Sequence, residues 1–160
     1  MSAPIRILAI CVHNSARSQM AEWYLNQFGE GRLAVESAGL EPGVINPLVI
    51  EVMREEGVDL SGKPTNGVFD FYRQGRLYDY VLTVCTAEQE ARCPLFPGVV
   101  RRLHWDLEDP SRVTGSHEEK LEKVRRIRDD IRERAQTLAA SLLAGKAAGR
   151  VQADAEKAPL

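Results

Sequence analysis

The sequence predicts a single α/β domain with an open, four-stranded, mainly parallel sheet that carries helices on both faces. Short apolar runs rich in β-branched residues alternate with segments of helical period, which is the order of βαβ units. The first run leads straight through a polar loop into a helical segment. The length of 160 residues suits one domain with its own core.

The first strand is expected at residues 5–10, a nearly continuous apolar run of the kind found in buried parallel strands. The polar loop 11–18 follows. A helix is then expected over residues 18–28, because its apolar side chains recur at helical spacing, and Gly29 or Gly31 ends it.

A second strand is expected at residues 33–37. Asn46 and Pro47 then open a helix of about ten residues, because proline favours the first helical position. The apolar face of this helix consists of Leu48, Val52 and Met53.

A third strand is expected at residues 79–84, ending at Cys85, and a fourth at residues 99–103. Open parallel sheets bind ligands beyond the carboxyl ends of their strands. Cys11 and Cys85 both stand at such an end, so we expect them on the functional edge of the sheet.

The last helix is the clearest element. Ser116 and Glu119 form a capping-box pattern, and Gly145 ends the helix. Its apolar stripe consists of Leu121, Val124, Ile127, Ile131, Ala135, Leu138 and Leu142. Residues 146–160 are Ala-rich, charged and without periodicity, so we expect a domain over residues 1–145 and a flexible C-terminal tail.

Composition narrows the class of protein. A net charge of −2 argues against binding to nucleic acid or a membrane surface by bulk electrostatics. No apolar run approaches the roughly 20 residues of a membrane span, and the first residues are too short and weakly basic for a signal peptide. We therefore expect a cytoplasmic protein, most simply a monomer, whose thiols stay reduced.

The three cysteines are too few, and odd in number, for a disulfide scaffold. Metal binding has little support, because the cysteines and the three histidines are scattered and lack the spacing of ligand pairs. We expect no metal site.

The loop that begins at Cys11 has the Cys-x5-Arg-Ser pattern of an oxyanion site. Backbone N–H groups of such a loop can point inward as an anion-binding nest, and the following helix adds its positive N-terminus. Arg17 supplies a planar fork of donors, and the same field favours the thiolate of Cys11. Ser18 is placed to donate to that thiolate, and Asn14 tolerates left-handed backbone. The expected oxyanion-binding residues are His13, Asn14, Ser15, Ala16, Arg17 and Ser18.

A simpler interpretation makes Cys11 a buried strand-end cysteine and Arg17 a surface cation. The strand before the loop and the helix after it, together with Asn14 and Ser18, favour the oxyanion site instead.

Thiolate attack that displaces an oxygen leaving group benefits from a general acid. Asp109, in a loop stiffened by Pro110, is one candidate and Asp106 is the other. Spacing alone does not separate them, and either can be an ordinary turn carboxylate.

Cys85 and Cys93 bracket a helix-friendly stretch. Eight helical positions rise about 12 Å, whereas a disulfide needs Cα atoms within about 7 Å. The two thiols therefore cannot bond while the stretch is helical, and Pro94 makes its end easy to loosen. They can be unrelated thiols, but beside a reactive Cys11 a disulfide relay is favoured.

These motifs together resemble the thioredoxin-coupled arsenate reductases, which share the fold of low-molecular-weight protein tyrosine phosphatases. The resemblance covers roughly residues 4–140 and rests on four pieces: CVHNSARSQMAE at 11–22, ESAG at 36–39, the Cys85/Cys93 pair before Pro94, and His104-Trp105 ahead of Asp109-Pro110. The family's acid precedes the proline, so the resemblance selects Asp109.

The resemblance implies a mechanism for arsenic detoxification. Cys11 attacks arsenate while Asp109 protonates the departing oxygen. Cys85 then attacks Cys11, arsenite leaves, and Cys93 takes over the disulfide as a redox-active Cys85–Cys93 pair. Thioredoxin or a similar dithiol protein reduces that bond, and no tightly bound cofactor is implied.

Two departures from the family pattern are visible. Relatives commonly have six residues between the relay cysteines, and here residues 86–92 make seven. Some members bind potassium through residues matching Asn14, Glu22 and Ser37 plus an aspartate that Asn66 replaces, so weak or absent potassium binding is implied.

Two rival functions remain. A tyrosine-type phosphatase, with phosphomonoesters as substrates, needs Cys11, Arg17 and Asp109 but no other thiol. Such enzymes usually follow Asp-Pro with an aromatic residue, whereas Ser111 and Arg112 follow here, so reduction is favoured and phosphatase activity is expected to be a weak side reaction. A non-enzymatic oxyanion-binding module would not need an acid.

Overall fold

The computed structural model describes residues 3–98 and 100–144. In chain order its elements are β1 (Ile5–Cys11), α1 (Arg17–Gly29), β2 (Leu33–Gly39), α2 (Pro47–Arg54), α3 (Val68–Arg73), β3 (Tyr80–Thr83), α4 (Ala87–Glu90), β4 (Arg101–His104), the 3-10 helix η1 (Pro110–Arg112) and α5 (His117–Ala144).

The four strands form one sheet in the order β2-β1-β3-β4, and all three pairings are parallel. The first strand therefore lies in the interior of the sheet, with Cys11 opposite Gly39 of β2 and Ile10 opposite Thr83 of β3. The predicted four-stranded α/β architecture is confirmed, and the carboxyl ends of all strands meet at one edge.

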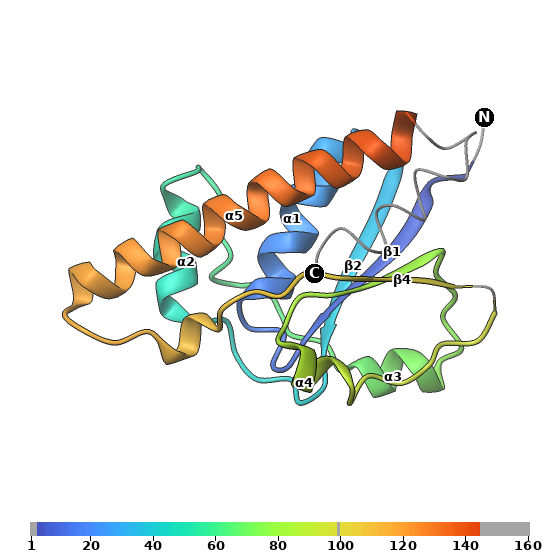
Figure 1. The fold of residues 1–160 in the computed structure, drawn as a ribbon, viewed down its shortest axis with the longest axis horizontal. Coiled ribbons are helices and arrows are strands. Elements are labelled where there is room, and N and C mark those ends of the chain that lie inside the picture. The colour runs from blue at the N-terminus through green and yellow to red at the C-terminus, as the bar shows by residue number, and fades with distance from the viewer. Residues whose placement is uncertain (1–2, 99, 145–160) are drawn as a thin grey trace.

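Helices cover both faces of the sheet (Figure 1). One core packs α1, α2 and α5 against alternate residues of β1, among them Ile7 and Ala9. The second core lies on the opposite face, where Leu8 and Ile10 meet Val68 and Phe71 of α3. Strand residues are thus buried on both sides, which explains the continuous apolar runs in the sequence.

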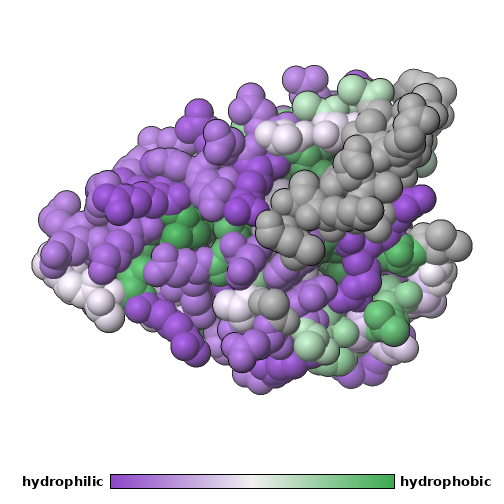
Figure 2. Space-filling model, viewed as in Figure 1, coloured by the Kyte–Doolittle hydropathy of each residue, from purple (hydrophilic) through white to green (hydrophobic). Residues whose placement is uncertain are grey.

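The capping box and apolar stripe of the last helix are confirmed. Ser116 Oγ accepts a hydrogen bond of 3.2 Å from the amide of Glu119, and Glu119 Oε1 accepts one of 2.8 Å from the amide of Ser116. All seven predicted stripe residues are buried, while the outward side of α5 is hydrophilic (Figure 2). Gly145 and the predicted tail lie outside the described residues.

Other boundaries differ from the prediction. The helix after Pro47 has eight residues and stops at Arg54. The end of α1 is confirmed, since Glu30 and Gly31 adopt left-handed φ values of 51° and 82°. The six-residue α3 was not predicted, because two buried side chains, Val68 and Phe71, make too short a pattern to show a period.

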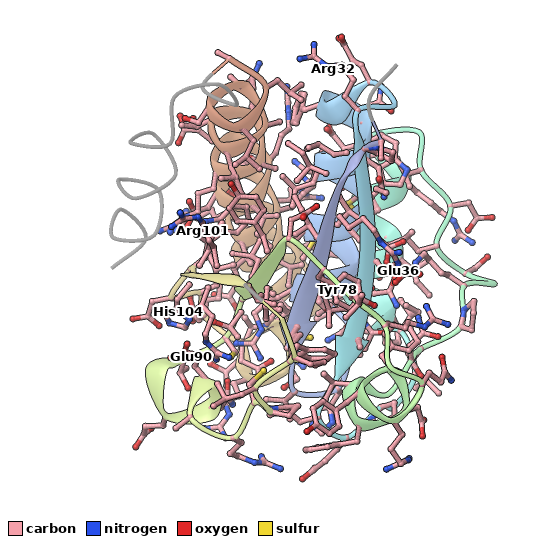
Figure 3. All side chains as sticks on the ribbon, turned by 90° about the vertical axis from the view of Figure 1, so that its right-hand side faces the viewer. Arg32, Glu36, Tyr78, Glu90, Arg101 and His104 are labelled. Atoms are coloured by element: carbon pink, nitrogen blue, oxygen red, sulfur yellow. The ribbon has the colours of Figure 1, made fainter. Side chains whose placement is uncertain are left out.

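A polar cluster ties β2 to the segment before β3. Glu36 accepts hydrogen bonds from the Tyr78 hydroxyl at 2.6 Å and from Arg76 Nη1 at 2.7 Å. Figure 3 shows Tyr78 and Glu36 directed toward each other.

Within the described residues, no helix has both the length and the apolarity needed to cross a membrane.

Candidate active site

The segment between β1 and α1 is a loop whose carbonyl groups face outward. Four amides from the segment after β2 donate to them: Leu40 N to Cys11 O (3.1 Å), Glu41 N to Val12 O (2.7 Å), Gly43 N to His13 O (3.0 Å) and Asn46 N to Ser15 O (2.8 Å). In a planar trans peptide the N–H points away from the preceding C=O, so the next residue's amide is turned inward each time. Inward amides at the start of a helix are the arrangement of an anion-binding nest.

Asn14 holds the loop in its unusual conformation. It is fully buried and its φ is 56°, as the sequence predicts for an asparagine that tolerates left-handed backbone. Its Nδ2 donates to Ser18 Oγ at 2.8 Å and to Ser37 Oγ at 2.9 Å. Its Oδ1 accepts from the amide of Asn66 at 2.8 Å and from Gln19 Nε2 at 3.1 Å. Four partners from three segments, namely α1, β2 and the chain before α3, fix this side chain.

Gly39 lets β2 lie directly against the loop. A Cβ atom on this residue would lie 2.6 Å from the amide nitrogen of Asn14 and 2.8 Å from the carbonyl oxygen of Val12. Both are backbone atoms of the loop and have little freedom to give way. Any side chain at position 39 would therefore displace the anion nest.

The nucleophile candidate, Cys11, is buried at the end of β1. Its Sγ lies 2.9 Å from Ser18 Oγ. Because the Asn14 amide already donates to that oxygen, the Ser18 hydroxyl hydrogen is available for the sulfur. A hydroxyl donor at this position stabilises negative charge on sulfur.

The same hydrogen-bond chain continues to a lysine. The Ser37 hydroxyl donates to Glu22 Oε1, and Lys63 Nζ lies 2.9 Å and 3.0 Å from the two Glu22 carboxylate oxygens. The chain thus runs from Lys63 through Glu22, Ser37, Asn14 and Ser18 to the sulfur of Cys11. A positive charge from the chain itself thus lies beside Glu22.

Arg17 lies under the loop and reaches the aspartate segment. Its side chain is 3% exposed; Nη1 donates to Leu107 O at 3.1 Å and Nη2 lies 3.5 Å from Asp109 Oδ2. Its Nε is buried without a hydrogen-bond partner among the described residues. Asp106 is exposed, so of the two predicted acid candidates the structure brings Asp109 to the arginine.

The environment of Asp109 favours its carboxylate form. Burial alone would raise the pKa of Asp109. The amide and hydroxyl of Ser111, at 2.9 Å and 2.8 Å from Oδ1, outweigh burial together with the charges of Arg17 and Arg112, and hold the pKa below its usual value. Asp109 is therefore ionised before an anion binds.

Cys85 follows β3 at the sheet edge that carries Cys11. The Val84 amide donates to Ile10 O at 2.8 Å, which sets the two strand ends side by side. Cys85 is buried, and burial raises its pKa to about 12; the charge of Arg17 acts in the opposite direction. In the reduced protein Cys85 is a neutral thiol.

Cys93 is half-buried at the end of the segment that starts at Cys85, and both are free thiols here. The helix between them is shorter than the sequence indicated: α4 has four residues, capped by Thr86 and Gln89, and the Cys93 amide then donates to Glu90 O at 3.1 Å. The expected separation of about 12 Å, which assumed a continuous helix between the two cysteines, therefore does not apply to this segment.

His13 is the predicted loop residue whose side chain lies outside the nest. Its ring is exposed and Nδ1 lies 2.9 Å from the carbonyl oxygen of Glu41. Only its backbone belongs to the loop, as for Ala16.

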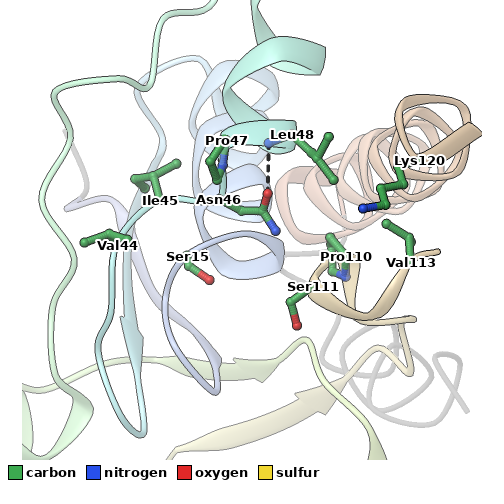
Figure 4. Close-up of a pocket in the computed structure, with 10 residues that line it drawn as sticks. All are labelled: Ser15, Val44, Ile45, Asn46, Pro47, Leu48, Pro110, Ser111, Val113 and Lys120. Atoms are coloured by element: carbon green, nitrogen blue, oxygen red, sulfur yellow. Dashed lines mark hydrogen bonds between the residues drawn. The ribbon is translucent and has the colours of Figure 1, made fainter. Parts of the chain in front are cut away.

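A cavity of about 300 Å³ lies beside the loop (Figure 4). Ser15 of the oxyanion loop and Pro110 and Ser111 of η1 line it from two sides, and the others are Val44, Ile45, Asn46, Pro47, Leu48, Val113 and Lys120. None of these ten residues is aromatic.

Across residues 3–98 and 100–144, no three His, Cys, Asp or Glu side chains gather as a metal-ligand set.

A cysteine at the end of an interior strand, followed by a closed anion loop and an arginine, defines a phosphatase-like oxyanion site. The family model for low molecular weight phosphotyrosine protein phosphatase matches residues 6–148. The chain therefore belongs to this family.

Several proteins similar to this chain are arsenate reductases. The arsenate reductase of Bacillus subtilis is 38% identical over 125 residues, which is 78% of this chain and 88% of that protein. A solved arsenate reductase in its oxidised state has a TM-score of 0.71 and 31% identity, covering 86% of this chain and 98% of that one. A thioredoxin-dependent arsenate reductase of Corynebacterium glutamicum has a TM-score of 0.59 and 30% identity, covering 85% of this chain and 64% of that one.

Sequence reasoning missed several residues that build the site. Leu107 contributes only a carbonyl oxygen, and Ser111 acts through a turn, so neither carries a recognisable motif. Lys63 and Gln19 contact the network across 41 and 45 positions of sequence, to Glu22 and Pro64, which no local pattern reveals. Gly39 was noted only as part of the family motif.

Proposed function

We propose that this protein reduces arsenate to arsenite with the thiolate of Cys11 as nucleophile. The observation that carries the proposal is that a free thiol, Cys85, follows β3 at the sheet edge that holds the anion loop, and a second free thiol, Cys93, lies eight positions further along the chain. A phosphatase needs only the loop, the arginine and the aspartate. The extra thiols are what a reduction requires, and the relatives named above are arsenate reductases.

In the first step the inward amides and Arg17 hold the arsenate dianion against Cys11. The Cys11 thiolate attacks arsenic, an arsenic–oxygen bond breaks, and Asp109 gives its proton to the departing oxygen, which leaves as water. Asp109 is ionised in the free protein. A bound dianion compensates the positive charge of Arg17 and places a second negative charge near Asp109. Both effects raise the pKa of Asp109, so that its carboxylate takes up a proton.

In the second step Cys85 attacks the sulfur of Cys11. A Cys11–Cys85 disulfide forms, and the electron pair of the broken sulfur–arsenic bond stays on arsenic, which leaves as arsenite. The proton of Cys85 has to depart, since the buried thiol is neutral at rest. Arg17 is the nearby positive charge that lowers the cost of that ionisation.

In the third step Cys93 attacks Cys85, which frees Cys11 and leaves a Cys85–Cys93 disulfide. An external dithiol reduces this bond by two successive exchanges. We propose thioredoxin for this role, in line with the thioredoxin dependence of the Corynebacterium relative. No tightly bound cofactor enters these steps, and we propose a cytoplasmic monomer, where the thiols stay reduced.

The test is arsenate-dependent NADPH oxidation with thioredoxin and thioredoxin reductase. The wild type should turn over repeatedly. Cys11→Ser should abolish both this activity and aryl phosphate hydrolysis, whereas Cys85→Ala and Cys93→Ala should stop repeated reduction and spare hydrolysis. Sustained thioredoxin-dependent turnover by Cys93→Ala would refute the three-thiol relay.

The second candidate is hydrolysis of phosphomonoesters through a Cys11 phosphate intermediate. The family match and the Cys11, Arg17 and Asp109 geometry favour it. The cavity beside the loop lacks an aromatic wall for a phosphotyrosine ring, so we propose hydrolysis as a weak side activity. If the catalytic efficiency on phosphotyrosine peptides exceeded that on arsenate, hydrolysis would be the main activity and arsenate reduction the side activity.

A further inference from the structure

Arg102, which the mechanism has not used, contacts the segment that ends at Cys93. It lies on β4, paired in register with Val81 of β3, so its backbone is fixed to the sheet. Its Nη2 lies 3.4 Å from Glu90 Oε2, and the backbone carbonyl of the same Glu90 accepts a hydrogen bond of 3.1 Å from the Cys93 amide, so the guanidinium charge acts on the Cys93 thiol. Figure 3 shows Glu90 and the β4 residue His104 on the same side of the molecule.

Burial and a neighbouring carboxylate oppose ionisation of the Cys93 thiol. Burial is the largest effect and raises the pKa of Cys93, and the Glu90 carboxylate raises it further. The thiol donates to the carbonyl oxygen of Pro94 at 3.5 Å. The charged or titratable groups that face it are Arg102 from β4, Glu90 from α4 and Cys85 after β3. Arg102 is the one cation of this set, and it also neutralises Glu90.

We propose that Arg102 is a positioning residue that prepares Cys93 for the third step of the relay. This inference rests on the proposed function. In that step the Cys93 thiolate attacks Sγ of Cys85, the Cys85–Cys93 bond forms, the Cys11–Cys85 bond breaks and Cys11 leaves as a thiolate. The proton of Cys93 passes to solvent, and the exchange involves no net oxidation. Arg102 stabilises the negative charge on the attacking sulfur and neutralises the neighbouring Glu90 carboxylate.

The direct test uses Cys11→Ser/Cys85→Ser protein, in which Cys93 is the remaining thiol. The rate of its alkylation by iodoacetamide is followed against pH. Arg102→Met should move the midpoint of this profile up by about one unit or more, and Arg102→Lys should restore most of the shift. Glu90→Gln should move the midpoint down. Arg101→Met, on the adjacent strand position, is the matched control and should leave it unchanged.

A second test follows a single turnover in the three-thiol protein. At neutral pH, Arg102→Met should slow formation of the Cys85–Cys93 disulfide about tenfold per unit of midpoint shift and leave the first release of arsenite unchanged. Aryl phosphate hydrolysis by Cys11 reports whether the variant is folded. An unmoved alkylation midpoint in Arg102→Met, or one that Arg101→Met moves equally, would overturn the inference. Absence of arsenite release by wild type would instead refute the proposed function, while the alkylation profile still decides the role of Arg102.

Discussion

The side chain of Arg17 connects the oxyanion loop with the segment that carries Asp109. Two of its nitrogens reach the segment before η1, at Leu107 O and Asp109 Oδ2, and its buried Nε faces no described partner. A planar guanidinium can satisfy a bound oxyanion and this segment at the same time, because its five N–H groups diverge in one plane. An ammonium group has the charge but not this geometry.

We therefore expect Arg17→Lys to weaken phosphate or arsenate binding about tenfold or more, close to 1.4 kcal/mol, despite the conserved charge. Isothermal titration with phosphate measures this. Arg112→Lys, at a side chain that is 80% exposed and 4.0 Å from Asp109, is the matched control and should bind normally. Unchanged affinity in Arg17→Lys would contradict the clamp role.

Ser111 lowers the pKa of Asp109, the candidate general acid. Its hydroxyl is one of the hydrogen-bond donors that lower the pKa of Asp109, so Ser111→Ala should raise that pKa. A general acid works while it is protonated, and activity falls as pH rises through its pKa. The alkaline limb of the kcat profile should therefore move to higher pH.

The control for Ser111→Ala is Ser61→Ala, because Ser61 stands two residues after Asp59 in a different turn and also lowers the pKa of its aspartate. The alkaline limb of that variant should match wild type. A limb that stays in place in Ser111→Ala, or moves to lower pH, would argue that Asp109 is not the acid.

At the scale of elements, the close contact between β2 and the oxyanion loop depends on Gly39. Gly39→Ala places a Cβ 2.6 Å from the Asn14 amide, so the loop must shift. We expect the free energy of unfolding to fall by about 1–3 kcal/mol. We also expect the affinity for phosphate to fall, because the shifted loop is the one that holds the anion. Chemical denaturation and phosphate titration measure both. Gly62→Ala, with open space at its Cβ, should be nearly neutral in each.

The contact between α1 and the segment before α3 depends on the Lys63–Glu22 pair. Lys63→Met leaves the partly buried Glu22 carboxylate without its cation, and should weaken the hold on Asn14 through Ser37. A double-mutant cycle with Glu22→Gln measures the coupling by denaturation, and we expect about 1 kcal/mol or more. Additive effects of the two changes would show that the pair does not act as a unit.

The elements that the sequence revealed are those with enough residues to show a period. The long apolar stripe of α5 and the apolar run of β1 could be read from the sequence. The loop from Cys11 to Ser18 could be read as well, because its residues are contiguous. Helix α3 and the brevity of α4 were not foreseeable, because four to six residues carry less than two helical turns of pattern. The Lys63–Glu22 pair forms only when distant segments meet in the folded chain.

At the scale of the whole molecule, the described sheet, both cores and the candidate site lie between Ile5 and Ala144. We propose residues 1–145 as the working domain. A chain ending at residue 145 should therefore unfold cooperatively, with a melting temperature close to that of the full chain, and should retain arsenate turnover. Calorimetry and the coupled assay decide this. A large drop in the melting temperature would assign residues 146–160 to the fold.

The Lys63–Glu22 contact also bears on the surroundings in which the protein works. A counter-ion that is covalently part of the chain is present in every molecule at a fixed place, whereas a dissolved alkali-metal ion must be captured from the medium at the concentration found there. The chain therefore carries this support for the nest at a place that the fold fixes.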